Sequence, residues 1–441
     1  MNEKLINSVL ESGIVGAGGA GFPTHVKLGG QADTVIINGA ECEPLLRVDQ
    51  QLMESEAARL LDALDLVVES VGAKSGVVAL KAHYHAAVES LNREIARHPK
   101  LSLYLLGTFY PAGDEQVIVY EVTKRIVPEG GIPLNVGVVV MNVETALNVL
   151  DAYNEGKPVT DKYVTLTGAV RNPKSVKVPL GITVREALEL AGGPTVSDYT
   201  VINGGPMMGI PVSPDSLITK TTKGLIVLPK GHSLLLSLKK PLSRSLRDAA
   251  IACMQCSLCT EVCPRHLLGH RLEPHKMMRL AAYGSVCDEK EGPMNAYLCC
   301  GCRLCEYACV MQLQPWKLNT SIKNTLGSKG IRNNLHAAPD HADPFRDTKR
   351  YPVSKLIRQL GLSEYDRPAP MEYKDYDFRK VTLPLRQSAG APSLPIVSVG
   401  DKVTRGDMIA KIQEGKLGTN QHASITGTVA AVTESAIIIE Q

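Results

Sequence analysis

Ten of the eleven cysteines in this 441-residue chain fall between residues 253 and 309, and eight of the ten form two copies of one spacing. The first copy is Cys253-x2-Cys256-x2-Cys259-x3-Cys263, followed by proline, and the second is Cys299-x2-Cys302-x2-Cys305-x3-Cys309. Three thiolates two residues apart with a fourth three residues further on are typical of [4Fe–4S] clusters. The spacing therefore predicts two [4Fe–4S] clusters and one-electron chemistry.

Zinc is the alternative ligand for this region, because thiolates at x2 spacing also bind Zn²⁺. Zinc sites use two pairs of cysteines rather than a triplet with a fourth cysteine, so the spacing favours iron–sulfur. By the crossed ligation of two-cluster ferredoxins, one cluster takes Cys253, Cys256, Cys259 and Cys309, and the other takes Cys299, Cys302, Cys305 and Cys263. Three cysteines stay outside this scheme, and we expect all of them to be packed structural side chains: Cys42, Cys287 and Cys300.

A second feature able to do chemistry is a glycine-rich stretch near the N-terminus. Glycines let backbone N–H groups approach an anion, and a helix start behind them adds its dipole. No Gly-Lys-Ser/Thr follows, and the spacing departs from the dinucleotide fingerprint. Taken alone, the run fits a flexible turn as well as a phosphate cradle. Its residues are Gly16, Gly18, Gly19, Ala20, Gly21 and Phe22.

Composition narrows the class of protein. Forty-eight Lys and Arg against 45 Asp and Glu give a net charge of +3, and aromatic residues make up only 4%. Neither a basic surface nor a base-stacking platform is indicated, so we expect no nucleic-acid partner. No run reaches the roughly 18 apolar residues of a transmembrane helix, and the N-terminus lacks a signal-peptide pattern. We expect a cytoplasmic protein with no transmembrane segment.

The elements that must position these residues fall into five regions. Residues 1–157 alternate strands (near 34–37, 77–81 and 136–142) with helices (3–10, 51–68, 86–96 and from 144), which predicts an α/β domain with a parallel sheet. Residues 158–235 predict a β-grasp module with a helix at 184–190. Residues 236–325 predict a helical, ferredoxin-like domain with a helix at 274–283. Residues 326–390 predict a proline-rich wrap with one helix at 353–360, and residues 391–441 predict a small β barrel-sandwich domain.

Three segments resemble the flavin domain of respiratory complex I's NADH-binding subunit and, more closely, the C subunit of the Rnf ion-pumping complex: 18–24 with Lys27, 38–44 and 142–145. The resemblance implies FMN bound by the glycine loop, Lys27, Asn38, Glu41, Asn142 and Thr145. Residues 110–115 resemble the segment where NADH stacks on the flavin, which adds Tyr110, Gly113, Asp114 and Glu115. It also makes Glu43 and Glu115 candidate contacts to the nicotinamide nucleotide.

The order of domains refines the resemblance. Two ferredoxin-like motifs favour the Rnf-like branch, but the segment at 422–427 resembles the Rnf barrel domain moved to the C-terminus. This arrangement is similar to the cobalamin reductases of propanediol-utilisation microcompartments. It implies an NADH-dependent reductase of cob(III)alamin, with a cob(I)alamin adenosyltransferase as partner and contact with microcompartment shell proteins. The alternatives are an Rnf-like electron-input subunit of a membrane complex and a non-catalytic electron relay.

Overall fold

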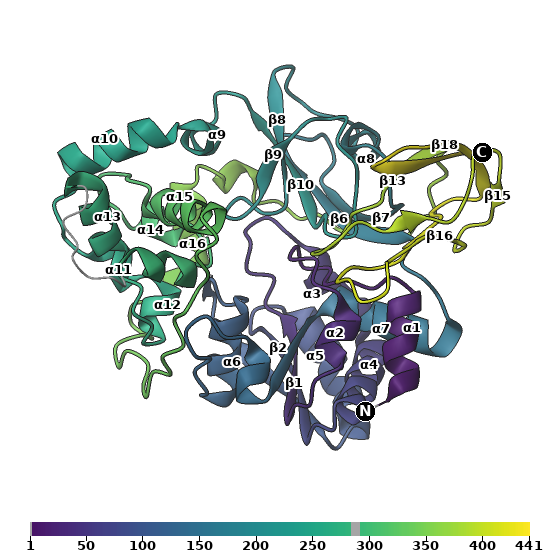
Figure 1. Ribbon diagram of the computed structural model, residues 1–441, viewed down its shortest axis with the longest axis horizontal. Coiled ribbons are helices and arrows are strands. Elements are labelled where there is room, and N and C mark those ends of the chain that lie inside the picture. The colour runs from purple at the N-terminus through teal and green to yellow at the C-terminus, as the bar shows by residue number, and fades with distance from the viewer. Residues whose placement is uncertain (1, 284–291) are drawn as a thin grey trace.

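The chain folds into neighbouring units in a computed structural model that describes residues 2–283 and 292–441. An N-terminal α/β unit lies below a mixed sheet drawn in teal, a helical unit lies on the left, and a yellow β unit lies on the right (Figure 1). The β unit contacts the end of the first helix, where Asn420 Nδ2 donates to the Leu10 carbonyl at 3.4 Å. Cys287 lies outside the described residues.

The N-terminal unit is built on a parallel sheet in the order β3-β2-β1-β5. Side chains of β1 alternate between two cores: Val35 and Ile37 pack with α4 and α7, whereas Ile36 packs with α6. Helices on both faces bury such a sheet, as predicted for an α/β domain. The strands are β1 (Thr34–Gly39), β2 (Ser75–Lys81), β3 (Leu101–Leu106) and β5 (Val138–Asn142), and the helices are α1 (Glu3–Glu11), α2 (Thr24–Leu28), α3 (Val48–Ser55), α4 (Ala57–Ser70), α5 (His85–Glu94), α6 (Glu115–Thr123) and α7 (Val143–Glu155).

The second unit is a six-stranded mixed sheet in the order β12-β7-β6-β10-β8-β9. β10 runs parallel to β6 and antiparallel to β8. Helix α8 begins at a capping box between Thr183 and Glu186, which is the sequence signature of a helix start. Its elements are β6 (Asp161–Gly168), β7 (Lys174–Pro179), α8 (Val184–Leu190), β8 (Tyr199–Asn203), β9 (Ile210–Val212), β10 (Gly224–Pro229) and β12 (Met371–Glu372).

The cysteine-rich unit is helical, with α13 packed between α10 and α15. Two four-residue helices, α11 and α14, follow the second cysteine of each motif. The helices are α9 (Ser233–Lys239), α10 (Leu242–Ala252), α11 (Leu258–Glu261), α12 (Pro264–Leu267), α13 (Pro274–Tyr283), α14 (Leu304–Tyr307), α15 (Pro315–Ser328) and α16 (Val353–Gln359), and a short ladder joins β4 (Phe109–Tyr110) to β11 (Tyr351–Pro352).

The C-terminal unit pairs two small antiparallel sheets, ordered β13-β19-β18-β15 and β14-β16-β17. Its first strand comes from residues 380–384, inside the stretch expected as a wrap. Within the described ranges, no helix is long and apolar enough to cross a bilayer. The strands are β13 (Lys380–Pro384), β14 (Leu394–Pro395), β15 (Lys402–Val403), β16 (Met408–Lys411), β17 (Gln421–His422), β18 (Gly427–Val432) and β19 (Ala436–Glu440).

The N-terminal unit differs from the sequence-based expectation in local detail. The single helix expected over 51–68 is two helices, because Glu56 leaves the helical region (φ −116°, ψ 25°) between α3 and α4. Two elements of this unit, β3 and α6, are not among the helices and strands expected from the sequence. β3 is an edge strand with several exposed positions, and α6 begins where the Asp114 side chain accepts hydrogen bonds from the first-turn amides.

Candidate functional site

The glycine-rich loop lies at the carboxyl end of β5, over the first turn of α7. The Ala17 amide donates to Thr145 Oγ1 at 2.9 Å, and a Cβ on Gly18 would lie 3.6 Å from the Asn142 side chain. Gly19 has φ 117°, a left-handed value that glycine adopts without strain, and a Cβ there would meet nothing within 4 Å. The outer side of the loop is therefore open, and a helix start lies behind it, as a phosphate cradle requires.

Four further candidates meet beside this loop, at the carboxyl ends of β1 and β5. Lys27 Nζ donates to Glu115 Oε1 and to the Val140 carbonyl, both at 2.9 Å. Asn38 Nδ2 donates to the Gly113 carbonyl at 2.8 Å. Ligands of open parallel sheets bind outside the carboxyl ends of the strands, so a flavin is expected at this edge of the sheet, which we name the cleft.

Two of the candidate carboxylates turn away from the open cleft. Glu41 is 8% exposed and accepts the Asp49 amide at 2.9 Å, at the start of α3. The Glu43 carboxylate accepts the backbone amides of Met207 and Met208, at 2.9 and 3.0 Å, from the hairpin of the second unit. Burial raises the pKa of Glu43 to about 7. Glu41 therefore connects its segment to α3, and Glu43 connects it to the second unit.

Tyr110 and Asp114 face the cysteine-rich unit. Tyr110 OH donates to the Cys302 carbonyl at 3.0 Å, and the tyrosine is 1% exposed. Asp114 pairs in a bidentate manner with Arg265, at 2.5 and 2.9 Å, two residues after Cys263. Burial alone would raise the pKa of Asp114, but the Arg265 guanidinium outweighs it and holds that pKa below its ordinary value. The segment at 110–115 thus joins the cleft to two predicted cluster ligands.

A buried charge network beneath the loop was not anticipated from the sequence. Lys162, 1% exposed, donates to the Ala17 carbonyl at 3.1 Å and forms an ion pair with Glu144. Lys223 pairs with Asp49 and lies 3.8 Å from Glu144. Both lysines come from the second unit, so that unit supports the loop from behind.

One sequence signal could have revealed this network. Period-two alternation along β6 places Lys162 on the same face as Val164 and Leu166, which are fully buried. A lysine at a core position of a strand demands a buried acid. Asn142 Nδ2 also donates to Asp49 Oδ2 at 2.9 Å, so a cleft residue is held by the same network.

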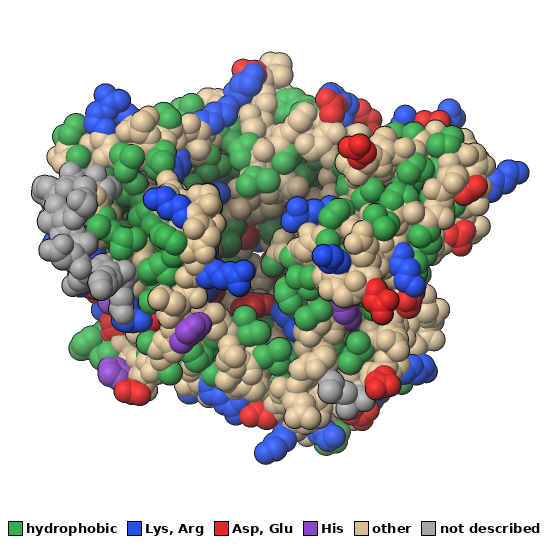
Figure 2. Space-filling view, viewed as in Figure 1, with side chains coloured by type: hydrophobic (Ala, Val, Ile, Leu, Met, Phe, Trp, Pro, Cys, Tyr) green, Lys and Arg blue, Asp and Glu red, His purple; other side chains and the backbone are tan. Residues whose placement is uncertain are grey.

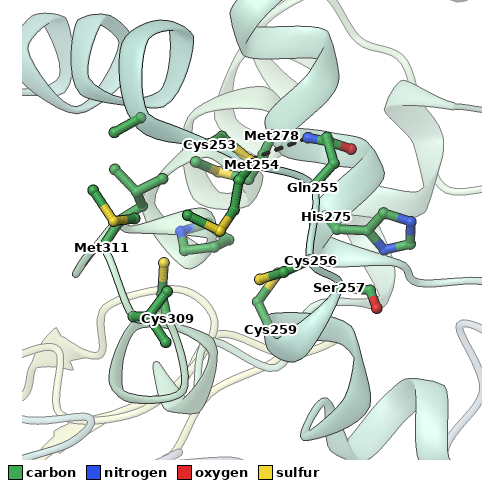
Figure 3. A pocket seen from close by; sticks show the side chains of 14 residues that line it. Cys253, Met254, Gln255, Cys256, Ser257, Cys259, His275, Met278, Cys309 and Met311 are labelled. Atoms are coloured by element: carbon green, nitrogen blue, oxygen red, sulfur yellow. Dashed lines mark hydrogen bonds between the residues drawn. The ribbon is translucent and has the colours of Figure 1, made fainter.

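Four cysteines, which we name the outer group, line one cavity: Cys253, Cys256, Cys259 and Cys309. Figure 3 shows their side chains around a common space, with Met254 and Met311 beside it. Cys256 is exposed, whereas Cys259 is 9% exposed. Gln255 Nε2 donates to Cys253 Sγ at 3.1 Å. The second motif thus supplies its last cysteine to the first motif, which is the grouping that crossed ligation requires.

The inner group holds the other four thiols: Cys263, Cys299, Cys302 and Cys305. Cys263 packs in the same small hydrophobic cluster as Cys299, and Cys302 and Cys305 follow Cys299 in the second motif. Three members are 6–8% exposed. Cys305 lies on α14 and Cys259 of the outer group lies on α11, and these two helices contact each other, so the two groups are neighbours.

The backbone repeats between the two motifs. Gln255 and Gly301, just before the second cysteine of each motif, have φ 56° and 71°, and Ser257 and Arg303, just after it, have φ 61° and 62°. These left-handed turns bend each motif around its own centre, which fits a cluster rather than an extended pair of metal ligands. Within the described part of the chain, no three His, Cys, Asp or Glu side chains are arranged to hold a single metal ion.

The leftover cysteines have separate environments. Burial raises the pKa of the Cys42 thiol to about 12, and its Sγ would lie 3.2 Å from a Cβ on Gly113, so Cys42 is a packed neutral side chain. Cys300 is partly buried and packs against the main hydrophobic core.

Four family models match this chain in turn. The Nuo51 FMN-binding domain matches residues 9–151, the SLBB domain matches 163–211, the 4Fe-4S dicluster domain matches 252–314, and the RnfC barrel sandwich hybrid domain matches 372–441. The predicted fold class is confirmed, and so is the pair of cofactor types, FMN and two [4Fe–4S] clusters.

Curated relatives cover nearly the whole chain. Cobalamin reductase PduS of Citrobacter freundii is 42% identical over 433 residues, which are 98% of this chain and 95% of the relative. The chain belongs to the cobalamin reductase PduS family. The PduS protein of Salmonella typhimurium is likewise 42% identical, over 99% of this chain and 96% of the relative. The C subunit of the Na(+)-translocating ferredoxin:NAD(+) oxidoreductase complex from Acetobacterium woodii is 38% identical, over 59% of this chain and 57% of the relative.

In a member of the PduS family, these contacts connect the predicted FMN site to the predicted cluster sites. The FMN-binding domain supplies the predicted flavin site, and the dicluster domain supplies the two cysteine groups. The segment at 110–115 lies between the cleft and the inner group, and the outer group lies at the surface.

Proposed function

We propose that this chain is an NADH-dependent cobalamin reductase that passes electrons from a nicotinamide nucleotide through FMN and two [4Fe–4S] clusters to cob(III)alamin. The observation that carries the proposal is that the segment at 110–115 joins the predicted FMN site to the inner cysteine group, and that the helices carrying Cys305 and Cys259 contact each other, next to the exposed Cys256. The names of the two full-length relatives support cobalamin as the acceptor.

When bound, FMN takes two electrons from NADH as a hydride and releases them singly, which iron–sulfur clusters and cobalt require. Each NADH, on becoming NAD⁺ and H⁺, therefore reduces two Co(III) to Co(II) or one Co(III) to Co(I). The eight thiolates of the two groups would hold the clusters. The chain's own contribution is to position these groups and to keep water from the transfer path.

Individual residues have separate tasks in this scheme. Backbone amides of the glycine loop would bind the FMN phosphate, and Lys27, Asn38, Asn142 and Thr145 would fix the loop and the ring. The Lys27–Glu115 pair stays partly exposed, with 23% and 49% of the side chains accessible, so it lies where a nucleotide can enter. Tyr110 and Asp114 would hold the inner cluster beside the ring.

The same proposal extends to the setting of the reaction. Co(I) reoxidises readily, so we infer direct transfer of the product to a cob(I)alamin adenosyltransferase. A place inside a propanediol-utilisation microcompartment, with shell proteins as neighbours, follows from the family and not from a feature of the structure.

An anaerobic assay tests the function. The protein is reconstituted with iron, sulfide and FMN, mixed with NADH and aquacobalamin, and followed by the corrinoid absorption bands. We expect conversion to Co(II) or Co(I) well above the rate given by NADH and free FMN. Bleached flavin and clusters with an unchanged corrinoid would support an Rnf-like electron-input subunit instead, and flavin that stays oxidised would support a relay.

A further inference from the structure

The two cysteine groups differ in how accessible they are to an external electron acceptor. Cys263, Cys302 and Cys305 of the inner group are 6–8% exposed and lie behind the segment at 110–115. In the outer group, Cys256 is exposed and lines a cavity that opens at the surface. An acceptor that reaches the outer group needs no rearrangement of the protein.

The rim of that cavity is apolar. Met254 and Val310 are each 63% exposed and Met311 is 45% exposed, and all three line the cavity with the outer group. Exposed hydrophobic residues adjoin it in sequence on the first motif, where Ile251 and Leu258 also reach solvent. On the left of Figure 2, over the helical unit, hydrophobic side chains gather between separate Lys and Arg side chains. We name Met254, Val310 and Met311 the outer face.

The outer face carries no charge of its own. Among the described residues that line the cavity there is no Lys, Arg, Asp or Glu. The imidazole of His275 is satisfied within the protein, because its Nδ1 lies 2.8 Å from Thr260 Oγ1. Exposed apolar patches of this kind mark sites where another molecule binds.

We propose that the outer face is the docking site for the corrin ring of the cobalamin substrate, so that cobalt receives electrons at the outer cysteine group. This inference rests on the proposed function and adds to it the place where the substrate binds. Charge matching favours the corrinoid: its macrocycle carries apolar methyl groups and uncharged amides, and an uncharged face suits it. An acidic electron-carrier protein would need a ring of Lys and Arg instead. Methionine thioethers adapt well to a large, irregular ring.

The test introduces a charge on the outer face. Met254→Glu and Val310→Glu are compared with Val399→Glu, a matched control in the C-terminal unit where the valine is 64% exposed. Initial rates of NADH-driven reduction are measured against aquacobalamin concentration. We expect KM for aquacobalamin to rise at least about tenfold in both outer-face variants, because an unpaired carboxylate must be desolvated under the ring. Val399→Glu should keep the wild-type KM, because this valine lies in another unit of the protein.

Two readouts separate docking from damage to the clusters. Iron content and the single-turnover bleaching of the clusters by NADH should match wild type in every variant. An unchanged KM in both glutamate variants, with the wild-type protein reducing aquacobalamin, would overturn the docking site and leave the face to another occupant, such as a protein. If the wild-type protein bleaches with NADH but leaves aquacobalamin oxidised, the proposed function fails, and the docking of a corrinoid fails with it.

Discussion

The two cysteine motifs have the same local backbone conformation, but the inner and outer cysteine groups have different surroundings. Both motifs place left-handed residues on either side of their second cysteine, and both continue into a four-residue helix. Three of the four inner thiols are buried, Cys299 is partly exposed, and the group is tied to the flavin cleft by Tyr110 and by the Asp114–Arg265 pair. The outer group is lined by methionines and open to solvent. Ligand spacing thus indicates the type of cofactor, whereas the residues around each motif determine the position of its cluster along the proposed electron-transfer path.

A second difference lies in the hydrogen bonds to sulfur. Gln255 of the outer motif donates to Cys253, but the corresponding position of the inner motif is Gly301, which has no side chain to donate. Hydrogen bonds to the sulfurs and solvent exposure both tune the reduction potential of a cluster. The two clusters should therefore differ in potential although their ligands are the same.

The largest effect should come from removing an inner ligand. In Cys302→Ala the inner cluster cannot assemble, so NADH-driven corrinoid reduction should fall to the rate of NADH with free FMN. NADH should still bleach the bound FMN, because the cleft is untouched. Iron content and the EPR spectrum of the reduced protein report the loss. Cys300→Ala is the matched control, since Cys300 is outside the predicted ligand set; loss of a cluster in that variant would contradict the assignment.

Breaking the buried pair between the cleft and the inner group should come next. Asp114→Asn leaves Arg265 charged and without its partner, at a cost of about 3–5 kcal/mol. We expect the inner cluster to be released at a lower temperature, measured by the loss of cluster absorption on heating. Asp114→Asn combined with Arg265→Met should recover part of the loss. Asp215→Asn breaks the exposed pair with Arg185 and should release the cluster at the wild-type temperature. An equal drop in this temperature in both variants would contradict the larger role of the Asp114–Arg265 pair.

The stability of the folded protein should also depend on pH, through Glu43. In the folded protein Glu43 keeps its proton up to about pH 7, whereas its ordinary pKa is 4.5, so the folded state binds more protons between these values. Its contribution to stability is therefore complete below about pH 4.5 and is lost as pH rises through 7, a difference of roughly 3 kcal/mol. Melting temperatures between pH 5 and 8 should fall for wild type and fall less for Glu43→Gln. Parallel curves for the two proteins would show that Glu43 does not titrate in this range.

The smallest effect should come from the outer group. Gln255→Leu removes the hydrogen bond to Cys253 Sγ, which stabilises the more negative, reduced cluster. The potential of the outer cluster should fall by on the order of tens of millivolts, and that of the inner cluster should not change. A redox titration followed by EPR measures both values. A shift in the inner potential alone would reverse the assignment of the two groups.

Much of this organisation is encoded in local sequence. Cysteine spacing and the alternation of strands and helices predict the units because each signal depends on neighbours in the chain. Helices α8 and α13 begin and end at the expected residues, 184–190 and 274–283. The cofactor types follow from the same short-range patterns and from the resemblance that the motifs carry.

The partner that each carboxylate side chain meets could not be predicted from the sequence. Glu41 and Glu43 lie in one short segment, yet one accepts an amide of α3 and the other accepts amides from the hairpin of the second unit. The partner of Lys162, Glu144, and the partner of Asp114, Arg265, are likewise distant in the chain. Such pairs depend on how the units pack, which no local pattern specifies.

The most direct test of the proposed route uses Cys256→Ala, in which the outer cluster is missing. The variant is mixed with NADH and aquacobalamin, freeze-quenched on the timescale of turnover, and examined by EPR, after iron analysis has shown one retained cluster. The proposed route requires that the inner cluster is reduced at the wild-type rate while the corrinoid stays as Co(III). Corrinoid reduction at the wild-type rate without the outer cluster would contradict it, and so would an inner cluster that NADH no longer reduces.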